Sequence, residues 1–252
     1  MTAKMFKMFS VKLAFASLIR YNIISIKRKR NMSKHYYIIV DTETTKKQTV
    51  ADFGAVVVDR SGAVHDRLGA MVTGHFGKFD LFSDPTAPSD SLWSAQSAKR
   101  RAKDYFAMME NGSRVWASVA FINQWLSAVN AKYSPVFTAY NSAFDISKCR
   151  NTGIDLGIFK QSFCLMKAAK SEIGPLAEYQ EFCRAYGLVT ARGNVRHTAD
   201  AMAKFVNFSG ERYGLMDDEP HTALEDAQFY EALILQRLVS KLTRKQLLEA
   251  GK

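Results

Sequence analysis

Cysteine is scarce in this chain, and its scarcity excludes two common roles for it. The 252 residues contain only three cysteines, Cys149, Cys164 and Cys183, and no two of them form a CxxC pair. A structural zinc site of the usual spacing is therefore excluded. An odd number of widely spaced thiols also does not make a disulfide framework. The cysteines predict buried free thiols in a protein of the reducing cytoplasm.

Long apolar runs, internal repeats and low-complexity tracts are missing as well. A membrane-spanning helix needs about 20 mostly apolar residues in a row, and no run in this chain approaches that length. Hydrophobic residues nevertheless make up 47% of the sequence and charged residues 23%, which is an ordinary balance for a globular protein. We therefore expect a folded protein that does not partner a membrane.

Acidic residues are absent from the first 34 positions, which sets that segment apart. It holds nine of the 35 Lys and Arg residues, so the rest of the chain carries 26 basic against 24 acidic residues. The formal net charge of +11 therefore does not by itself indicate a nucleic-acid partner. We interpret residues 1–31 as a basic extension of open origin: a targeting segment, a binding tail, or a mis-assigned start before Met32. Residues 32–252 would form the functional domain.

The pattern of apolar residues after the extension predicts a single α/β domain, with a mixed five-stranded sheet flanked by helices. The expected strands are 35–40, 50–59, 63–73, 135–140 and 159–165. The expected helices are 92–110, 115–131, one that begins at Ser142, 176–186, 197–208 and 222–242. A long loop over 74–91, rich in Gly, Pro, Asp and Ser, is of a length that often serves function.

Two carboxylates stand at the end of the first expected strand. Asp41 and Glu43 are two positions apart, and side chains at i and i+2 of a strand point to the same face. The carboxyl end of a strand is where ligand sites of α/β sheets lie. Two adjacent carboxylates repel each other unless a cation compensates. The alternative interpretation is an ordinary solvated strand end.

A third carboxylate, Asp145, follows the fourth expected strand. The pair Ser142 and Asp145 matches a capping box at a helix start, which is a purely structural interpretation. The location favours function, because this helix starts beside the expected Asp41 and Glu43 site.

The last helix begins with a similar pattern. Thr222 and Glu225 match a capping box with Thr222 as the N-cap, which leaves His221 just outside the helix and Asp226 inside it. Asp226 stands at the head of an apolar stripe, so it is expected to face the sheet, where a buried carboxylate needs a partner. The structural alternative is a surface histidine with an acidic residue that favours the helix dipole.

Together these residues predict a metal-dependent hydrolase site. Carboxylate oxygens suit Mg²⁺ or Mn²⁺ rather than zinc. Two such ions can activate a water and stabilise the leaving oxygen of a phosphodiester. A histidine near neutral pKa suits deprotonation of that water.

The three motifs in this order resemble the DEDDh branch of the DnaQ-like 3′–5′ exonucleases, a group within the ribonuclease H-like fold. The segments are Asp41-Thr-Glu-Thr-Thr45, Asn141-Ser-Ala-Phe-Asp145 and His221-Thr-Ala-Leu-Glu-Asp226, and the resemblance covers about residues 36–240. It implies a nuclease that binds the single-stranded 3′ end of DNA or RNA and releases nucleoside 5′-monophosphates. By the same resemblance, Asp41, Glu43, Asp145 and Asp226 would bind two Mg²⁺ or Mn²⁺ ions, and His221 would be the general base.

The sequence also departs from the family pattern. Lys46 stands where relatives usually have glycine, and Tyr140 stands where many have histidine. The segments 74–91 and 187–218 look like elaborations, and small phage-encoded exonucleases are similar in this respect.

Substrate contacts are marked only weakly. The candidates near the motifs are Thr44, Asn141 and Phe144, the last as a residue that stacks on a terminal base. Arg192 and Arg196, and a basic run from Lys99 to Lys103, are candidates for phosphate contacts, with solvated surface positions as the alternative.

Three interpretations of function stay open at this point. One is an unrelated metal-binding α/β protein in which the motifs occur by chance, and two others follow from the resemblance. The first is an active exonuclease, for which the sequence distinguishes neither DNA from RNA nor the oligomeric state. The second is a catalytically silent exonuclease-like module that binds nucleic acid or a polymerase. The complete set of five site residues favours the first.

Overall fold

The first apolar run of the chain forms the central strand of a sheet. The computed structural model describes residues 35–89, 91, 93–209 and 220–252. In it β1 (Tyr36–Thr44) pairs antiparallel with β2 (Val50–Asp59), and β2 pairs antiparallel with β3 (Val64–Val72). The two apolar runs on either side of Arg60-Ser61-Gly62 therefore form a β-hairpin.

The other half of the sheet is parallel to β1. β5 (Val136–Ala139) pairs with β1, and β6 (Ser162–Cys164) pairs with β5. The strand order is β4-β3-β2-β1-β5-β6, and the sheet is mixed. Because β1 and β5 are parallel neighbours, their carboxyl ends lie at the same edge of the sheet. This places the segment after Asp41 beside the start of the helix that carries Asp145.

The expected count of five strands is wrong, because the sheet has six. β4 (Val115–Ala117) pairs parallel with β3, whereas the sequence pattern suggested that a helix begins at Val115. The helix α3 (Val119–Tyr133) instead begins after Ser118, whose side chain accepts a hydrogen bond from the backbone of Phe121. Three residues are too few for apolar periodicity to separate a strand from a first helical turn.

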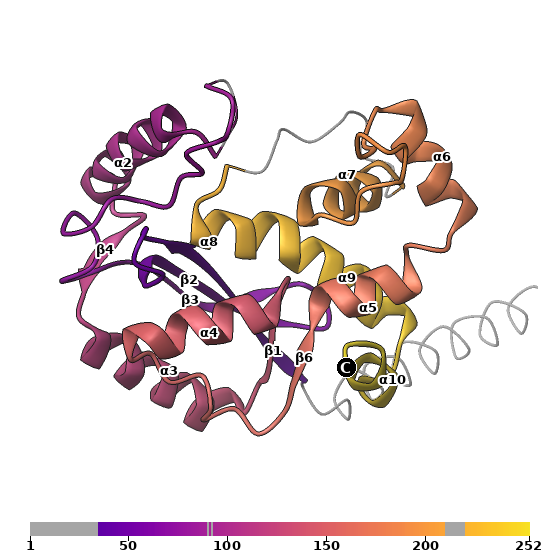
Figure 1. Cartoon of the computed structure of the whole chain (residues 1–252). Helices are drawn as coiled ribbons and strands as arrows, with labels where there is room; N and C mark the ends of the chain where they lie inside the picture. Colours follow the sequence, from indigo (N-terminus) through magenta and orange to yellow (C-terminus); the bar gives the residue numbers. More distant parts are fainter. Residues whose placement is uncertain (1–34, 90, 92, 210–219) are drawn as a thin grey trace, which may run out of the picture. The chain divides into compact units, whose positions relative to one another are not determined.

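Helices cover both faces of the sheet (Figure 1). On one face α3 and α4 (Ser142–Thr152) pack over a core that includes Ile38, Val40 and Phe137. The opposite face carries a larger core that includes Tyr37 and Ile39. Its helices are α5 (Leu165–Glu172), α6 (Ala177–Ala185), α7 (Ala199–Ser209) and α9 (Ala232–Lys241).

A separate small core lies under the helix that follows the long loop. This helix, α2 (Ala95–Glu110), packs through Ala98 and Tyr105 against Met71 of β3 and Phe76 of the loop. The loop is thereby attached to the domain at the side of the sheet that bears β3 and β4.

The helical segment predicted over 222–242 is continuous but not uniform. Its first turn is α8 (Ala223–Glu225), its middle is a π-helical stretch, η1 (Asp226–Glu231), and its remainder is α9. A further helix, α10 (Arg244–Ala250), follows. The predicted span 222–242 therefore holds as a helical segment, while its π-helical middle was not expected.

By backbone contacts a compact unit spans Tyr36–Lys252. The predicted extension, residues 1–31, lies outside the described residues, so its boundary and origin stay predictions. Among the helices that the structure describes, none combines the length and the apolar character needed to cross a bilayer.

Candidate metal centre

The first two acidic residues lie on the central strand where its pairing becomes irregular. Asp41 and Glu43 are partly buried positions of β1, and between them Thr42 is buried. The pairing of β1 with β2 shifts register between Glu43 and Thr44. A bulge of this kind bends a strand and re-aims its side chains, and bulges are frequent beside functional sites.

Asp145 reaches the same region from α4. Its side chain is 3% exposed, and its Oδ1 accepts a hydrogen bond of 2.9 Å from Oγ1 of Thr42 on β1. The capping box predicted for Ser142 and Asp145 is wrong, because Asn141 is the N-cap and makes no side-chain cap hydrogen bond. Asp145 therefore faces the strand that carries Asp41 instead of capping its own helix.

The third motif packs against both β1 and β2. His221 stands outside the helix, as predicted, and has a left-handed backbone with φ of 54°. That conformation is costly for a residue with a side chain and persists only where the surroundings hold it. Asp226, the first residue of η1, is 2% exposed.

Three of the predicted residues bring ligand atoms together. One nitrogen of His221 and one carboxylate oxygen each of Glu43 and Asp226 lie within 4.8 Å of one another. They line a pocket of about 420 Å³ together with Asp41. The other described residues of its lining are Thr42, Thr44, Gln48, Phe82, Asp84, Trp93 and Phe144.

The charges of the remaining carboxylates affect the pKa of Asp41. Burial raises the pKa of Asp41 well above its ordinary value, and the charges of Glu231, Asp145, Asp226 and Glu43 raise it further. Burial also raises the pKa of Asp145 to about 7, although hydrogen bonds from Thr42 lower it in part. Without a cation, this concentration of carboxylates opposes its own ionisation.

A fifth carboxylate, Glu231, was missed by the sequence analysis. It is 1% exposed, its Oε1 accepts a hydrogen bond of 3.3 Å from the backbone of Tyr140, and its charge acts on Asp41. Glu231 is five residues after Asp226, and in a π-helix residues five apart are hydrogen-bonded neighbours. An α-helix would turn it away, so only the π-helical stretch brings it to the site. Its acidic character inside an apolar stripe was the available signal.

The long loop and the residues after it contribute aromatic groups that the sequence analysis also left unassigned. The Trp93 ring meets the His221 imidazole edge-on, with 5.3 Å between ring centroids, and the Phe82 ring lies 6.0 Å from that of Trp93. Trp93 is 40% exposed. Aromatic residues inside a loop rich in Gly, Pro and Ser would have been the signal for them.

A buried ion-pair network holds the third motif against β2. The guanidinium of Arg114, which precedes β4, donates from Nε to Oδ1 of Asp52 at 2.9 Å and from Nη1 to Oε1 of Glu225 at 3.1 Å. Oδ2 of Asp52 in turn accepts the backbone N–H of Ala223 at 2.9 Å. Thr222 is the N-cap, as predicted, but the capping box with Glu225 does not form: Thr222 Oγ1 donates to the Glu225 carboxylate, and Asp52 accepts the backbone N–H at the helix start instead.

Glycine at position 54 permits this close approach. A Cβ on Gly54 would lie 2.1 Å from the backbone carbon of Ala223, so a side chain there would push the segment away. The start of the last helix is thus pressed directly onto β2, with His221 and Asp226 on either side of the contact.

The weaker binding candidates divide into two groups. Thr44 and the 41% exposed Phe144 line the pocket. Asn141, Arg192 and Arg196 are not among its described lining residues. Arg192 is exposed, and the Arg196 Nε donates to the backbone oxygen of Val189. These three positions therefore gain no support as contacts of a ligand in this pocket.

The fold and the pocket define an α/β protein whose mixed sheet presents a group of carboxylates and a histidine at one edge. No protein-family model, curated protein or solved structure matches the chain. Its function must therefore be argued from the chemistry of this site.

Proposed function

We propose that the chain is a metal-dependent 3′–5′ exonuclease of the ribonuclease H-like fold that hydrolyses the terminal phosphodiester bond of DNA or RNA. The products would be nucleoside 5′-monophosphates. One observation supports the proposal most: the ionisable residues of the first and third motifs gather at one pocket, where Glu43, His221 and Asp226 have ligand atoms within 4.8 Å of one another. Asp145 of the second motif is not among the described residues that line this pocket. The charges of Asp145 and Asp226 also act on Asp41.

The donor set fits divalent cations that prefer oxygen. Asp41, Glu43, Asp145 and Asp226 would hold Mg²⁺ or Mn²⁺, for which carboxylates are the usual protein ligands. Neighbouring carboxylates raise the pKa of Asp41, and a bound cation would remove that opposition to ionisation. When bound, such ions would activate a water and stabilise the leaving oxygen of a phosphodiester.

The chain's own residues would supply orientation and proton transfer. His221 would accept the proton of the attacking water, a role that suits an imidazole because it ordinarily titrates near neutral pH. Trp93 contacts the edge of this ring and would limit its rotation. Phe82, Trp93 and Phe144 would offer faces for stacking the terminal base, since all three line the pocket.

The proposal is tested with 5′-labelled, single-stranded DNA and RNA oligonucleotides. We expect a ladder of products shortened from the 3′ end with Mg²⁺ or Mn²⁺, and no products with a chelator. His221→Ala should lower kcat by at least about a hundredfold, the lower end of the range for loss of a general base, with little change in the unfolding temperature. His65→Ala is the matched control, because His65 pairs with Asp59 and does not line the pocket.

Two outcomes would contradict the proposal. Hydrolysis that continues unchanged in His221→Ala or with chelator would mean that the activity does not come from this site. Binding of oligonucleotides without any hydrolysis in Mg²⁺ or Mn²⁺ would support the silent binding module instead.

A further inference from the structure

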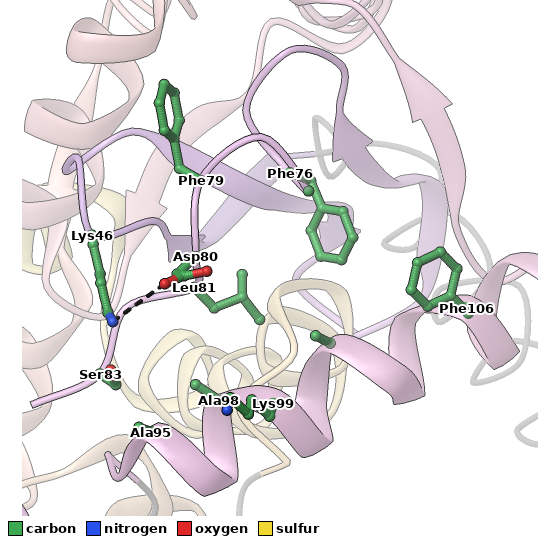
Figure 2. A pocket seen from close by; sticks show the side chains of 12 residues that line it. Lys46, Phe76, Phe79, Asp80, Leu81, Ser83, Ala95, Ala98, Lys99 and Phe106 are labelled. Atoms are coloured by element: carbon green, nitrogen blue, oxygen red, sulfur yellow. Dashed lines mark hydrogen bonds and ion pairs between the residues drawn. The ribbon is translucent and has the colours of Figure 1, made fainter.

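A second pocket, of about 220 Å³, lies between α2 and the chain that follows β3. Figure 2 shows Phe76 and Phe106 near one end of it and Lys46 and Ser83 near the other. The other described residues of its lining are Gly77, Phe79, Asp80, Leu81, Ala95, Ala98, Lys99 and Ala102. None of them lines the metal pocket.

The two pockets share a wall, the extended segment of residues 80–84. This segment runs along the end of β1: the Phe82 N–H donates to the Thr44 oxygen at 2.7 Å, and the Lys46 N–H donates to the Asp80 oxygen at 2.9 Å. Side chains of an extended segment alternate between its two sides. Phe82 and Asp84 accordingly line the metal pocket, and Leu81 and Ser83 line the second one.

The lining of the second pocket combines aromatic faces with ammonium groups. Phe106 is 56% exposed, and its ring lies 6.3 Å from that of Phe76. Lys46 and Lys99 supply the positive charge, and one carboxylate, Asp80, lies 3.4 Å from the Lys46 ammonium. Lys46 and Asp80 are 49% and 81% exposed, and such surface pairs are weak. A phosphate can therefore compete with Asp80 for Lys46.

The basic residues at the start of α2 differ in what they contact, and only one of them lines the second pocket. Lys99 lines the second pocket. Arg101 is 6% exposed and lies 6.0 Å from the ring centroid of Trp93, while Arg100 donates to Ser97. Lys103 is not among the described lining residues, so of the four basic residues Lys99 is the one placed to meet an anion in this pocket.

We propose that this second pocket binds an upstream nucleotide of the single strand whose 3′ end occupies the metal pocket. The base would lie against the exposed ring of Phe106, beside the 6% exposed Phe76, and the adjoining phosphate would meet Lys46 and Lys99. Stacking faces beside cations are the usual means by which proteins hold single-stranded nucleic acid without reading its sequence. The inference rests on the proposed function, because it takes the metal pocket as the site of the 3′ end.

The test compares a substrate that reaches both pockets with one that reaches only the first. The long substrate is a single-stranded decanucleotide, and the short one is a nitrophenyl ester of a nucleoside 5′-monophosphate, which has no upstream nucleotide. Phe106→Ala should raise KM and Kd for the decanucleotide roughly tenfold and leave hydrolysis of the ester unchanged. Lys99→Gln should lower the slope of log Kd against log salt by about one.

Phe121→Ala and Lys160→Gln are the matched controls. Phe121 is an exposed aromatic residue of α3, and Lys160 is an exposed lysine. Neither lines either pocket, so neither substitution should change either measurement.

The outcomes separate this inference from the proposed function. If the ester is hydrolysed but Phe106→Ala and Lys99→Gln bind the decanucleotide as the wild type does, the second pocket is not a nucleotide site and the exonuclease proposal stands. If neither substrate is hydrolysed, the exonuclease proposal fails. Decanucleotide affinity, measured by fluorescence anisotropy with chelator, then still decides the second pocket: equal affinity in wild type and both variants overturns it.

Discussion

Asp145 is a single residue that lowers the stability of the metal-free fold, because its carboxylate is buried. The carboxyl is 3% exposed, and burial raises its pKa to about 7. In the unfolded chain an aspartate titrates near its ordinary value, so between about pH 4 and 7 folding requires uptake of a proton. The stability of the metal-free protein should therefore fall as the pH rises through this window.

Replacing Asp145 by asparagine should remove this penalty. Asp145→Asn keeps an oxygen that can accept the Thr42 hydrogen bond but carries no charge to bury. In chelator at pH 8 we expect its free energy of unfolding to exceed that of the wild type by on the order of 1 kcal/mol or more, and its unfolding temperature to be higher. Its hydrolytic activity should be lost.

Thermal unfolding of the two proteins at pH 4.5 and pH 8 measures the effect. The gain should be small at the lower pH, where Asp145 is protonated in the folded wild type. Asp104→Asn, at an exposed position of α2, is the control and should show no such dependence. A gain that is the same at both pH values would mean that the charge of Asp145 is not what opposes folding.

At the scale of elements, the site depends on how the last helix meets β2. Arg114 is 2% exposed and joins Asp52 on β2 to Glu225 at the helix start. These contacts hold Ala223 and Glu225, which lie between His221 and Asp226 in the sequence, and they do not enter the pocket. Arg114 is therefore a positioning residue, whose loss should alter the geometry of the site more than the binding of substrate.

Arg114→Lys tests this role while it keeps a positive charge beside Asp52. A lysine cannot donate to both carboxylates with the planar fork of a guanidinium, so the helix start should shift. Small displacements of reacting groups cost up to about a hundredfold in rate. We expect kcat to fall roughly ten- to a hundredfold, with KM within about twofold of the wild type.

Arg67→Lys is the matched control for this substitution. Arg67 donates to Gln228 at an exposed position of β3, so its change should leave kcat unaltered. If Arg114→Lys instead raised KM with kcat preserved, the network would serve substrate binding, and its assignment to positioning would be wrong.

The same elements show how far the sequence alone reaches. β1 to β3 were predictable, because long runs such as Val50–Asp59 are buried along nearly their whole length. β4 was not, because three residues carry no usable period. Neither capping box forms, because the hydrogen-bond partners come from distant parts of the chain: Asp145 accepts from Thr42, and the Ala223 N–H at the start of α8 donates to Asp52. A local sequence pattern does not reveal partners of this kind.

The candidate site residues were likewise predictable from the sequence only in part. Asp41, Glu43, His221 and Asp226 were predictable as lining residues because strand ends and helix starts have readable signals. Glu231 was not, because its place depends on a π-helical stretch that the apolar pattern does not reveal. Trp93 reaches His221 from beyond the long loop, and the course of a loop is set by contacts far away in the sequence.

At the scale of the whole molecule, the sheet collects acidic groups from three distant parts of the chain, and a core on each face holds them there. Folding against this repulsion is favourable only because the cores are large, and cations in the pocket would add to stability by mass action. The proposed function requires that this pocket bind two divalent ions.

The most direct test is the anomalous scattering of Mn²⁺ in crystals of the full chain soaked with that ion. We predict two peaks about 4 Å apart, both within ligand distance of the carboxylates of Asp41, Glu43 and Asp226. Asp226→Asn crystals treated in the same way should lose at least one peak. An empty pocket in the soaked wild type, with Mn²⁺ bound only elsewhere on the protein, would contradict the account.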